Sequence, residues 1–214
     1  MATKQKSSSP FRLGVLVSGS GSNLQSIIDK LHNGPSDIEV AVVVSDNNKA
    51  YGLTRAAEAG IPTAVFPMID FEERSEHDEA MAAELQRHGV DLVVLAGYMM
   101  LVTHALLYRF PNRVINLHPS LLPSFPGATP IEDTMDYGAR ITGVTVHFVD
   151  EGADTGPIIL QEPVEIKYND TVESLRGRIH EVEHQLLPRA IELIASGRVS
   201  FDTENPRRVL VEED

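Results

Sequence analysis

The first half of the chain alternates short apolar runs with amphipathic stretches. The apolar runs lie at Arg12–Val17, Glu39–Val44, Thr63–Phe66, Asp91–Ala96 and Arg113–His118. Most of them are continuous Val, Ile and Leu without polar alternation, which is typical of parallel strands that are covered on both faces. Helical patterns lie between them, at Leu24–Asn33, Ala50–Ala59 and Glu73–His88. This order predicts an α/β fold with an open, mostly parallel twisted sheet and helices on both faces.

The pattern changes in the second half of the chain. A loop rich in Pro and Gly covers residues 119–130, and we expect a short helix after it, to about Gly138. Two further strands are expected at Thr142–Val149 and Ile158–Ile166, and a long helix from an N-cap at Thr171 to about Ser196. The sequence predicts a single domain over residues 11–203, a disordered tail at residues 1–10 and a polar tail at residues 204–214.

The composition excludes several kinds of function. The 214 residues include no cysteine, so thiolate catalysis, zinc–thiolate sites and disulfides are excluded. The chain has 18 Lys and Arg and 31 Asp and Glu, and the resulting net charge of −13 argues against a duplex nucleic-acid partner. No segment approaches the roughly 18 consecutive apolar residues of a transmembrane helix. The first residues also lack the apolar centre of a signal peptide, so we expect a cytoplasmic location.

A loop of small residues follows the first predicted strand. Ser18-Gly-Ser-Gly-Ser-Asn23 stands before a helix that begins at about Leu24. Free backbone N–H groups at a helix start favour an anion. Leu24 occupies the position where a dinucleotide-binding fingerprint has Gly, and the Lys of a nucleoside-triphosphate loop is missing. A phosphate monoester therefore fits this loop better, with a tight strand-to-helix turn as an equal alternative.

Asn116 and His118 lie two positions apart at the end of the fifth predicted strand. Strand side chains alternate between faces, so both point the same way, at the carboxyl end where open α/β sheets have their active sites. Asp154 lies in the loop between the two later strands, and its carboxylate could hold and charge-stabilise His118. The alternatives are a hydrogen-bonded core Asn with a surface His, and an ordinary turn at Asp154. For Asp154 taken alone, the turn is the better interpretation.

The other histidines and the acidic run suggest no further site. His147 lies in the middle of a predicted strand, without the spacing or third ligand of a metal site. We interpret it as a hydrogen-bonded core histidine and expect no metal. His77 lies on a predicted helix and is expected at the surface. The acidic run Asp70–Glu79 is interpreted as a solvated helix face.

Three motifs together resemble those of the folate-dependent formyltransferases. They are Ser18–Asn23, Asn116-Leu-His-Pro-Ser-Leu-Leu-Pro123 and Asp154-Thr-Gly-Pro157, and the resemblance runs from about Phe11 to Arg198. It implies the Rossmann-like sheet of this family, with 10-formyltetrahydrofolate as the formyl-donating cosubstrate. The first loop resembles that of the branch which formylates glycinamide ribonucleotide in purine biosynthesis. The implied partners are these two small molecules, with no nucleic acid and no membrane, in a monomer or a homodimer.

The resemblance also implies roles for individual residues. Asn116 and His118 would stabilise a tetrahedral intermediate and Asp154 would support them, so these three residues would be catalytic. Glu183 would bind the ribose hydroxyls, and the substrate phosphate would be held by Gly21, Ser22 and Asn23. The folate would lie against Met99, Met100, Leu101, Val102, Asp150, Glu151, Gly152 and Ala153. Two positions depart from the family pattern, because Met100 replaces an Arg of many members and Thr129 lies in a stretch that carries His in many members.

Two other functions remain open at this point. A deformylase similar to formyltetrahydrofolate hydrolase would use the same residues with water as the acceptor, and it would release formate without the amine. A non-catalytic nucleotide-binding module would bind a sugar phosphate without folate-dependent turnover, but it leaves the arrangement of Asn116, His118 and Asp154 unexplained.

Overall fold

One sheet of seven strands forms the centre of the molecule. The computed structural model describes residues 9–32 and 34–212, so the tail predicted at residues 1–10 lies outside the described residues except for Ser9 and Pro10. The strands stand in the order β3-β2-β1-β4-β5-β6-β7. Their bounds are β1 Phe11–Val17, β2 Ile38–Ser45, β3 Thr63–Val65, β4 Leu92–Leu95, β5 Val114–His118, β6 Ile141–Phe148 and β7 Ile158–Glu165.

The sheet is parallel over its first five strands and antiparallel at one side. β6 pairs antiparallel with β5, and β7 pairs antiparallel with β6. The predicted α/β fold with an open, mostly parallel sheet is therefore confirmed. The β5–β6 register sets Asn116 directly opposite His147. Directly opposed residues have their side chains on the same face of a sheet, so His147 shares the face of Asn116.

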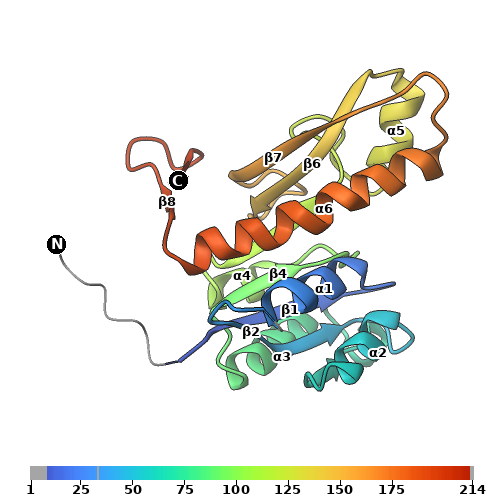
Figure 1. The fold of residues 1–214 in the computed structure, drawn as a ribbon. Coiled ribbons are helices and arrows are strands. Elements are labelled where there is room, and N and C mark those ends of the chain that lie inside the picture. The colour runs from blue at the N-terminus through green and yellow to red at the C-terminus, as the bar shows by residue number, and fades with distance from the viewer. Residues whose placement is uncertain (1–8, 33, 213–214) are drawn as a thin grey trace.

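Helices cover both faces of the sheet (Figure 1). On one face, α1 (Ser22–Ile27) and α6 (Val172–Ala195) pack on Leu13 and Val15 of β1. On the other face, α3 (Arg74–Arg87) and α4 (His104–Arg109) pack on Leu16. The remaining helical elements are α2 Tyr51–Glu58, α5 Pro130–Tyr137, a π-helical turn at Ile28–His32 and a 3₁₀ turn at Met68–Asp70. Among the described residues, no helix has the length and apolarity needed to cross a membrane.

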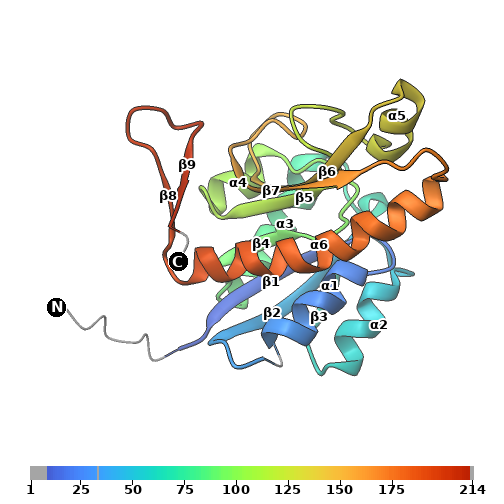
Figure 2. The same ribbon diagram turned by 45° about the horizontal axis from the view of Figure 1, so that its top comes forward.

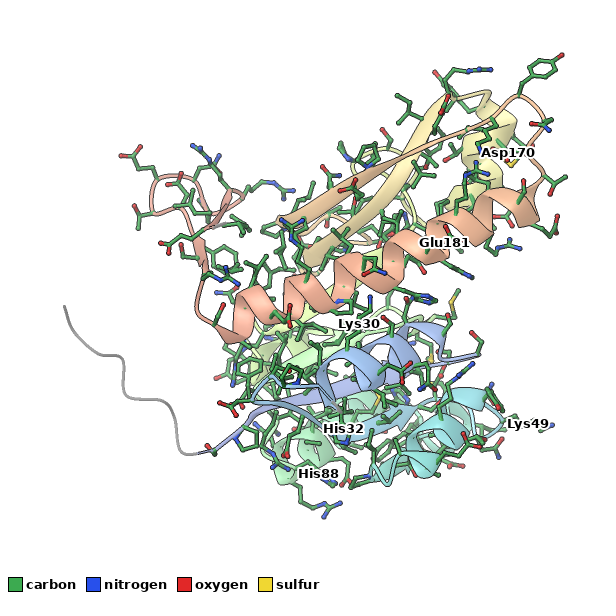
Figure 3. All side chains as sticks on the ribbon, viewed as in Figure 1. Lys30, His32, Lys49, His88, Asp170 and Glu181 are labelled. Carbon is green, nitrogen blue, oxygen red and sulfur yellow. The ribbon has the colours of Figure 1, made fainter. Side chains whose placement is uncertain are left out.

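Local side-chain contacts fix the start of α6. The Thr171 side chain accepts a hydrogen bond from the Ser174 backbone N–H, and the Ser174 hydroxyl accepts one from the Thr171 N–H. Asp170 stands just before this cap (Figure 3) and accepts hydrogen bonds from the Arg178 guanidinium. These bonds hold the pKa of Asp170 below its ordinary value. The N-cap predicted at Thr171 is confirmed.

The structure differs from the sequence prediction at the end of the chain. Val209–Val211 forms strand β9, which pairs antiparallel with β8, Val199–Phe201. The segment predicted as a polar tail at residues 204–214 therefore contains half of a hairpin. Figures 1 and 2 show this hairpin projecting beyond the end of α6. The ring of Phe201 packs on Phe148 of β6 with centroids 4.8 Å apart, which ties the hairpin to the main sheet.

A second difference lies on α3. His77 and Asp78 are both 0% exposed, so the predicted surface histidine and the predicted solvated acidic face are wrong at these two positions. Both residues lie one turn before the buried Met81 and Ala82 of the same helix. Residues three or four positions apart share a helix face, so His77 and Asp78 belong to the face that packs on the sheet.

Candidate active site

Close backbone packing shapes the loop between β1 and α1. Gly21 is the N-cap of α1 and has a left-handed φ of 68°. A Cβ at this position would lie 2.6 Å from the Cα atom of Gly52. Both the conformation and the contact therefore favour Gly at position 21. The first turn of α1 has no side-chain cap, so its N–H groups stay available to an anion.

Asn23 and Glu183 join α1 to the middle of α6. Asn23 Nδ2 donates to Glu183 Oε2 at 3.0 Å, and Glu183 is only 5% exposed. Burial raises the pKa of Glu183 to about 7, although the hydrogen bond from Asn23 acts in the opposite direction. The Oδ1 atom of Asn23 is buried without a hydrogen-bond partner. The pair thus combines a carboxyl that changes charge near neutral pH with an unused amide acceptor.

Three residues predicted to be catalytic meet at the end of β5. Asn116 Nδ2 donates to Asp154 Oδ1 at 3.3 Å, and Asp154 Oδ2 lies 3.5 Å from His118 Nδ1. His118 Nε2 donates to the backbone oxygen of Phe125 at 2.9 Å. Asp154 has a left-handed φ of 55°, and its Oδ2 accepts the N–H of Gly127 at 2.9 Å. The loops after β5 and β6 therefore hold the His118 ring and the Asp154 carboxylate against each other.

The surroundings of Asp154 favour its ionised form. Burial acts to raise its pKa, but His147, the Gly127 N–H and His118 together outweigh burial and lower the pKa below its ordinary value. The ionised carboxylate lies 3.5 Å from His118 Nδ1 and can act there as a hydrogen-bond acceptor. Asp154 is therefore suited to orient His118 and to support a positive charge on it.

His147 belongs to the same cluster, and its position there was not predicted from the sequence. Its Nδ1 donates to the backbone oxygen of Phe148 at 2.8 Å, so in the neutral ring Nε2 is an acceptor. That Nε2 lies 3.3 Å from Asn116 Nδ2 and 3.8 Å from Asp154 Oδ1. The prediction of a hydrogen-bonded core histidine is confirmed, since His147 is 2% exposed. Its position beside Asn116 follows from the β5–β6 register, for which the sequence carries no signal.

One cleft of about 580 Å³ connects the β1–α1 loop with this cluster. Most of the predicted site residues line it, namely Gly21, Ser22, Asn23, Met99, Met100, Leu101, Asn116, His118, Gly152, Ala153, Asp154 and Glu183. Three predicted folate contacts lie outside the lining. Val102 is buried, and Asp150 accepts hydrogen bonds from Gly152 and Thr155 within its own loop. Glu151 faces His104, with Oε1 3.1 Å from Nδ1.

Two further cleft residues on α6 were not predicted. Arg176 and His180 line the cleft together with Glu183. These three positions follow one another at spacings of four and three, which places them on one helix face. Burial, and then the charge of Arg176, lowers the pKa of His180. The helical spacing was the available signal. Among the described residues, no group of three or more His, Asp and Glu is arranged to hold a metal ion.

Comparison with known proteins points to one family. The formyl transferase family matches residues 11–191 of the chain. Glycinamide ribonucleotide transformylase 1 from Symbiobacterium toebii has a similar structure, with a TM-score of 0.92 and 47% identity over 97% of this chain and 96% of that chain. Phosphoribosylglycinamide formyltransferase of Haemophilus influenzae is 42% identical over 88% of this chain and 89% of that protein.

Longer proteins are similar to the chain as well. The trifunctional purine biosynthetic protein adenosine-3 of Chironomus tentans is 46% identical over 89% of this chain. The chain spans 14–20% of the length of this relative and of three other trifunctional proteins that it matches. The family match nevertheless covers the whole seven-stranded sheet and most of α6. The chain belongs to the formyl transferase family.

Proposed function

We propose that the chain transfers the formyl group of 10-formyltetrahydrofolate to the amino group of glycinamide ribonucleotide, a step of purine biosynthesis. The observation that carries this proposal is one continuous cleft, which runs from the β1–α1 loop and Glu183 to Asn116, His118 and Asp154. A substrate with a phosphate at one end and an amine at the other fits this arrangement. The names of the relatives from Symbiobacterium toebii and Haemophilus influenzae support it.

The two substrates would occupy different parts of the cleft. The phosphate would accept hydrogen bonds from the N–H groups at the start of α1, which has no side-chain cap. The ribose hydroxyls would donate to the Glu183 carboxylate. The folate ring would lie against Met99 and Leu101, two residues that are 68% and 67% exposed and offer apolar surface. The Gly152–Ala153 segment lines the cleft as well.

Asn116 would stabilise the tetrahedral intermediate. The amine attacks the formyl carbon, a C–N bond forms, and the carbonyl oxygen becomes an oxyanion. The two partners of Asn116 Nδ2 lie 3.3 Å away, at the long end of the hydrogen-bond range. One amide hydrogen can therefore turn to the oxyanion at little energetic cost. Removing such a donor typically lowers kcat by about 10²–10³-fold.

His118 and Asp154 would move the proton. The attacking amine must lose a proton, which would pass through water to Asp154 and on to His118, and the folate nitrogen must gain one as its bond to the formyl carbon breaks. His118 can supply that proton, and the Asp154 carboxylate at 3.5 Å stabilises the charged ring. No covalent intermediate on the protein is required. Much of the remaining acceleration would come from holding both substrates next to each other.

The test is an assay with both substrates and the purified chain. Formation of formylglycinamide ribonucleotide is the expected result, and it should fall by about 10²–10⁴-fold in His118→Ala. Formate release at the same rate without the amine would instead identify a deformylase. Binding of the ribonucleotide without turnover would identify a binding module. A His118→Ala variant with the kcat/KM of the unmodified chain would refute the assigned role of His118.

A further inference from the structure

A fully buried His–Asp pair lies beneath one wall of the cleft and has no part in the proposed chemistry. His77 and Asp78 are 0% exposed, and neither lines the cleft. The Nδ1 atom of His77 lies 3.0 Å from Asp78 Oδ1, and its Nε2 donates to the backbone oxygen of Phe66 at 2.9 Å. The ring of Phe71 covers His77 edge-on, with centroids 5.2 Å apart. The pair therefore links α3 to the segment that follows β3.

The second carboxylate oxygen of Asp78 reaches the cleft wall. Asp78 Oδ2 accepts a hydrogen bond from the backbone N–H of Thr103, the N-cap of α4. Thr103 directly follows the segment 99–102, which includes the cleft residues Met99, Met100 and Leu101. At the other end of this segment, the Met99 N–H donates to Ser18 Oγ at 3.0 Å. The segment thus has one fixed point at each end.

The fixed point at Asp78 is the stronger of the two. A buried carboxylate oxygen that loses its hydrogen-bond donor keeps its full desolvation penalty, because no water replaces the donor. The Ser18 hydroxyl lies near the surface and can exchange its partner for water at small cost. Movement of Thr103 away from α3 would therefore be opposed much more strongly than movement of Met99 away from Ser18.

We propose that Asp78, oriented by His77, is a positioning residue that fixes the segment 99–102 in the conformation that receives the folate. This inference rests on the proposed function, since it assumes that the segment 99–102 forms the folate side of the cleft. Asp78 contacts neither substrate under this proposal. It acts only through the backbone of Thr103, so its loss should weaken folate binding and leave ribonucleotide binding intact.

Two substitutions at Asp78 separate hydrogen bonding from charge. Asp78→Ala leaves the Thr103 N–H without an acceptor. Asp78→Asn keeps both contacts, because its Oδ1 can accept the Thr103 N–H while its Nδ2 donates to His77 Nδ1. The matched control is Glu79→Ala on the same helix, which removes an exposed contact between Glu79 and Arg109 of α4 at 2.5 Å. The control loosens α3 from α4 without touching Thr103.

The first experiment measures KM for each substrate, at a temperature where thermal unfolding shows every variant folded. We expect KM for the folate to rise at least fivefold in Asp78→Ala and less than twofold in Asp78→Asn and Glu79→Ala. KM for the ribonucleotide should stay within twofold in all of them. An unchanged folate KM in Asp78→Ala overturns the proposal, and so does an equal rise for both substrates.

The second experiment is amide hydrogen exchange of the unmodified chain. It requires no substrate and no variant. The Thr103 amide should exchange at least 100-fold more slowly than an unprotected peptide. A Thr103 amide that exchanges as fast as an unprotected peptide overturns the proposal even if Asp78→Ala does not fold. A chain that shows the slow Thr103 amide but no formyl transfer would refute the proposed function and leave the anchoring of the segment standing.

Discussion

Replacing Glu183 by Gln should stabilise the protein at alkaline pH although it removes a proposed substrate contact. Burial raises the pKa of Glu183 from the ordinary value of 4.5 to about 7. Each pKa unit corresponds to about 1.36 kcal/mol, so ionising this carboxyl in the folded protein costs about 3 kcal/mol more than in the unfolded chain. The Gln side chain has nearly the same shape, cannot ionise, and can accept the same hydrogen bond from Asn23 Nδ2.

The sign of the pH dependence follows from the raised pKa. The folded protein binds the proton of Glu183 more tightly than the unfolded chain does. The stability that this group contributes is therefore complete below about pH 4.5 and is lost as the pH rises through about 7. Glu183→Gln should be more stable than the unmodified chain by about 3 kcal/mol at pH 8, and by about half of that at pH 5.5.

Urea unfolding at both pH values measures this difference. The chain contains no Trp, so far-UV circular dichroism is the suitable signal, with free energies of unfolding taken by linear extrapolation. Glu181→Gln is the matched control, because Glu181 is an exposed carboxylate on the same helix (Figure 3). The control should change the free energy of unfolding by less than about 0.5 kcal/mol at either pH. A gain in Glu183→Gln that is equal at both pH values, or a loss at pH 8, would refute the reasoning.

Three further outcomes are expected. Asp154→Asn should lower kcat/KM by about 10²–10⁴-fold in a steady-state assay, since a neutral amide cannot support a charge on His118. A kcat/KM within threefold of that of the unmodified chain would contradict this prediction. Gly21→Val should lower the Tm by roughly 4–8 °C and raise KM for the ribonucleotide, because the Cβ of Val would lie 2.6 Å from the Cα atom of Gly52. Gly19→Ala is the control, because a Cβ at position 19 meets no atom within 4 Å. His147→Phe should lower kcat about five- to tenfold with both KM values unchanged, because Asn116 loses one hydrogen-bond acceptor. A change confined to KM would contradict this prediction.

Four strands of the parallel half, β1, β2, β4 and β5, were predictable because they are mostly buried and mostly apolar. Two short elements could not be predicted in this way. The helix His104–Arg109 covers only six residues, too few to establish a 3.6-residue period. The strand Val209–Val211 covers three residues between charged neighbours, and it becomes visible only through its pairing with Val199–Phe201. Both elements depend on tertiary contacts that a linear pattern does not contain.

The part of the site that lies on a single strand could be predicted, because side chains alternate between the two faces along a strand. Asn116 and His118 share one strand, so their common face followed from the sequence. The position of His147 depends on a register between two strands, which no spacing along the chain specifies. The prediction for His77 and Asp78 failed for a different reason. Their polar residue types suggested exposed positions, while their helical phase relative to the buried Met81 indicated burial. Helical phase was the better guide at these two positions.

The hydrogen bond between Asn23 and Glu183 joins positions 160 residues apart, and this separation has a consequence for biosynthesis. Ribosomes add about 5–20 residues per second, so Glu183 is made about 8–30 s after Asn23. Throughout that interval, β1 and α1 have emerged but the carboxylate that faces them has not. A substrate stabilises only the chain that can bind it. Under the proposed function, the ribonucleotide would therefore not assist folding of the nascent chain, and it would begin to protect the protein only when α6 has left the ribosome.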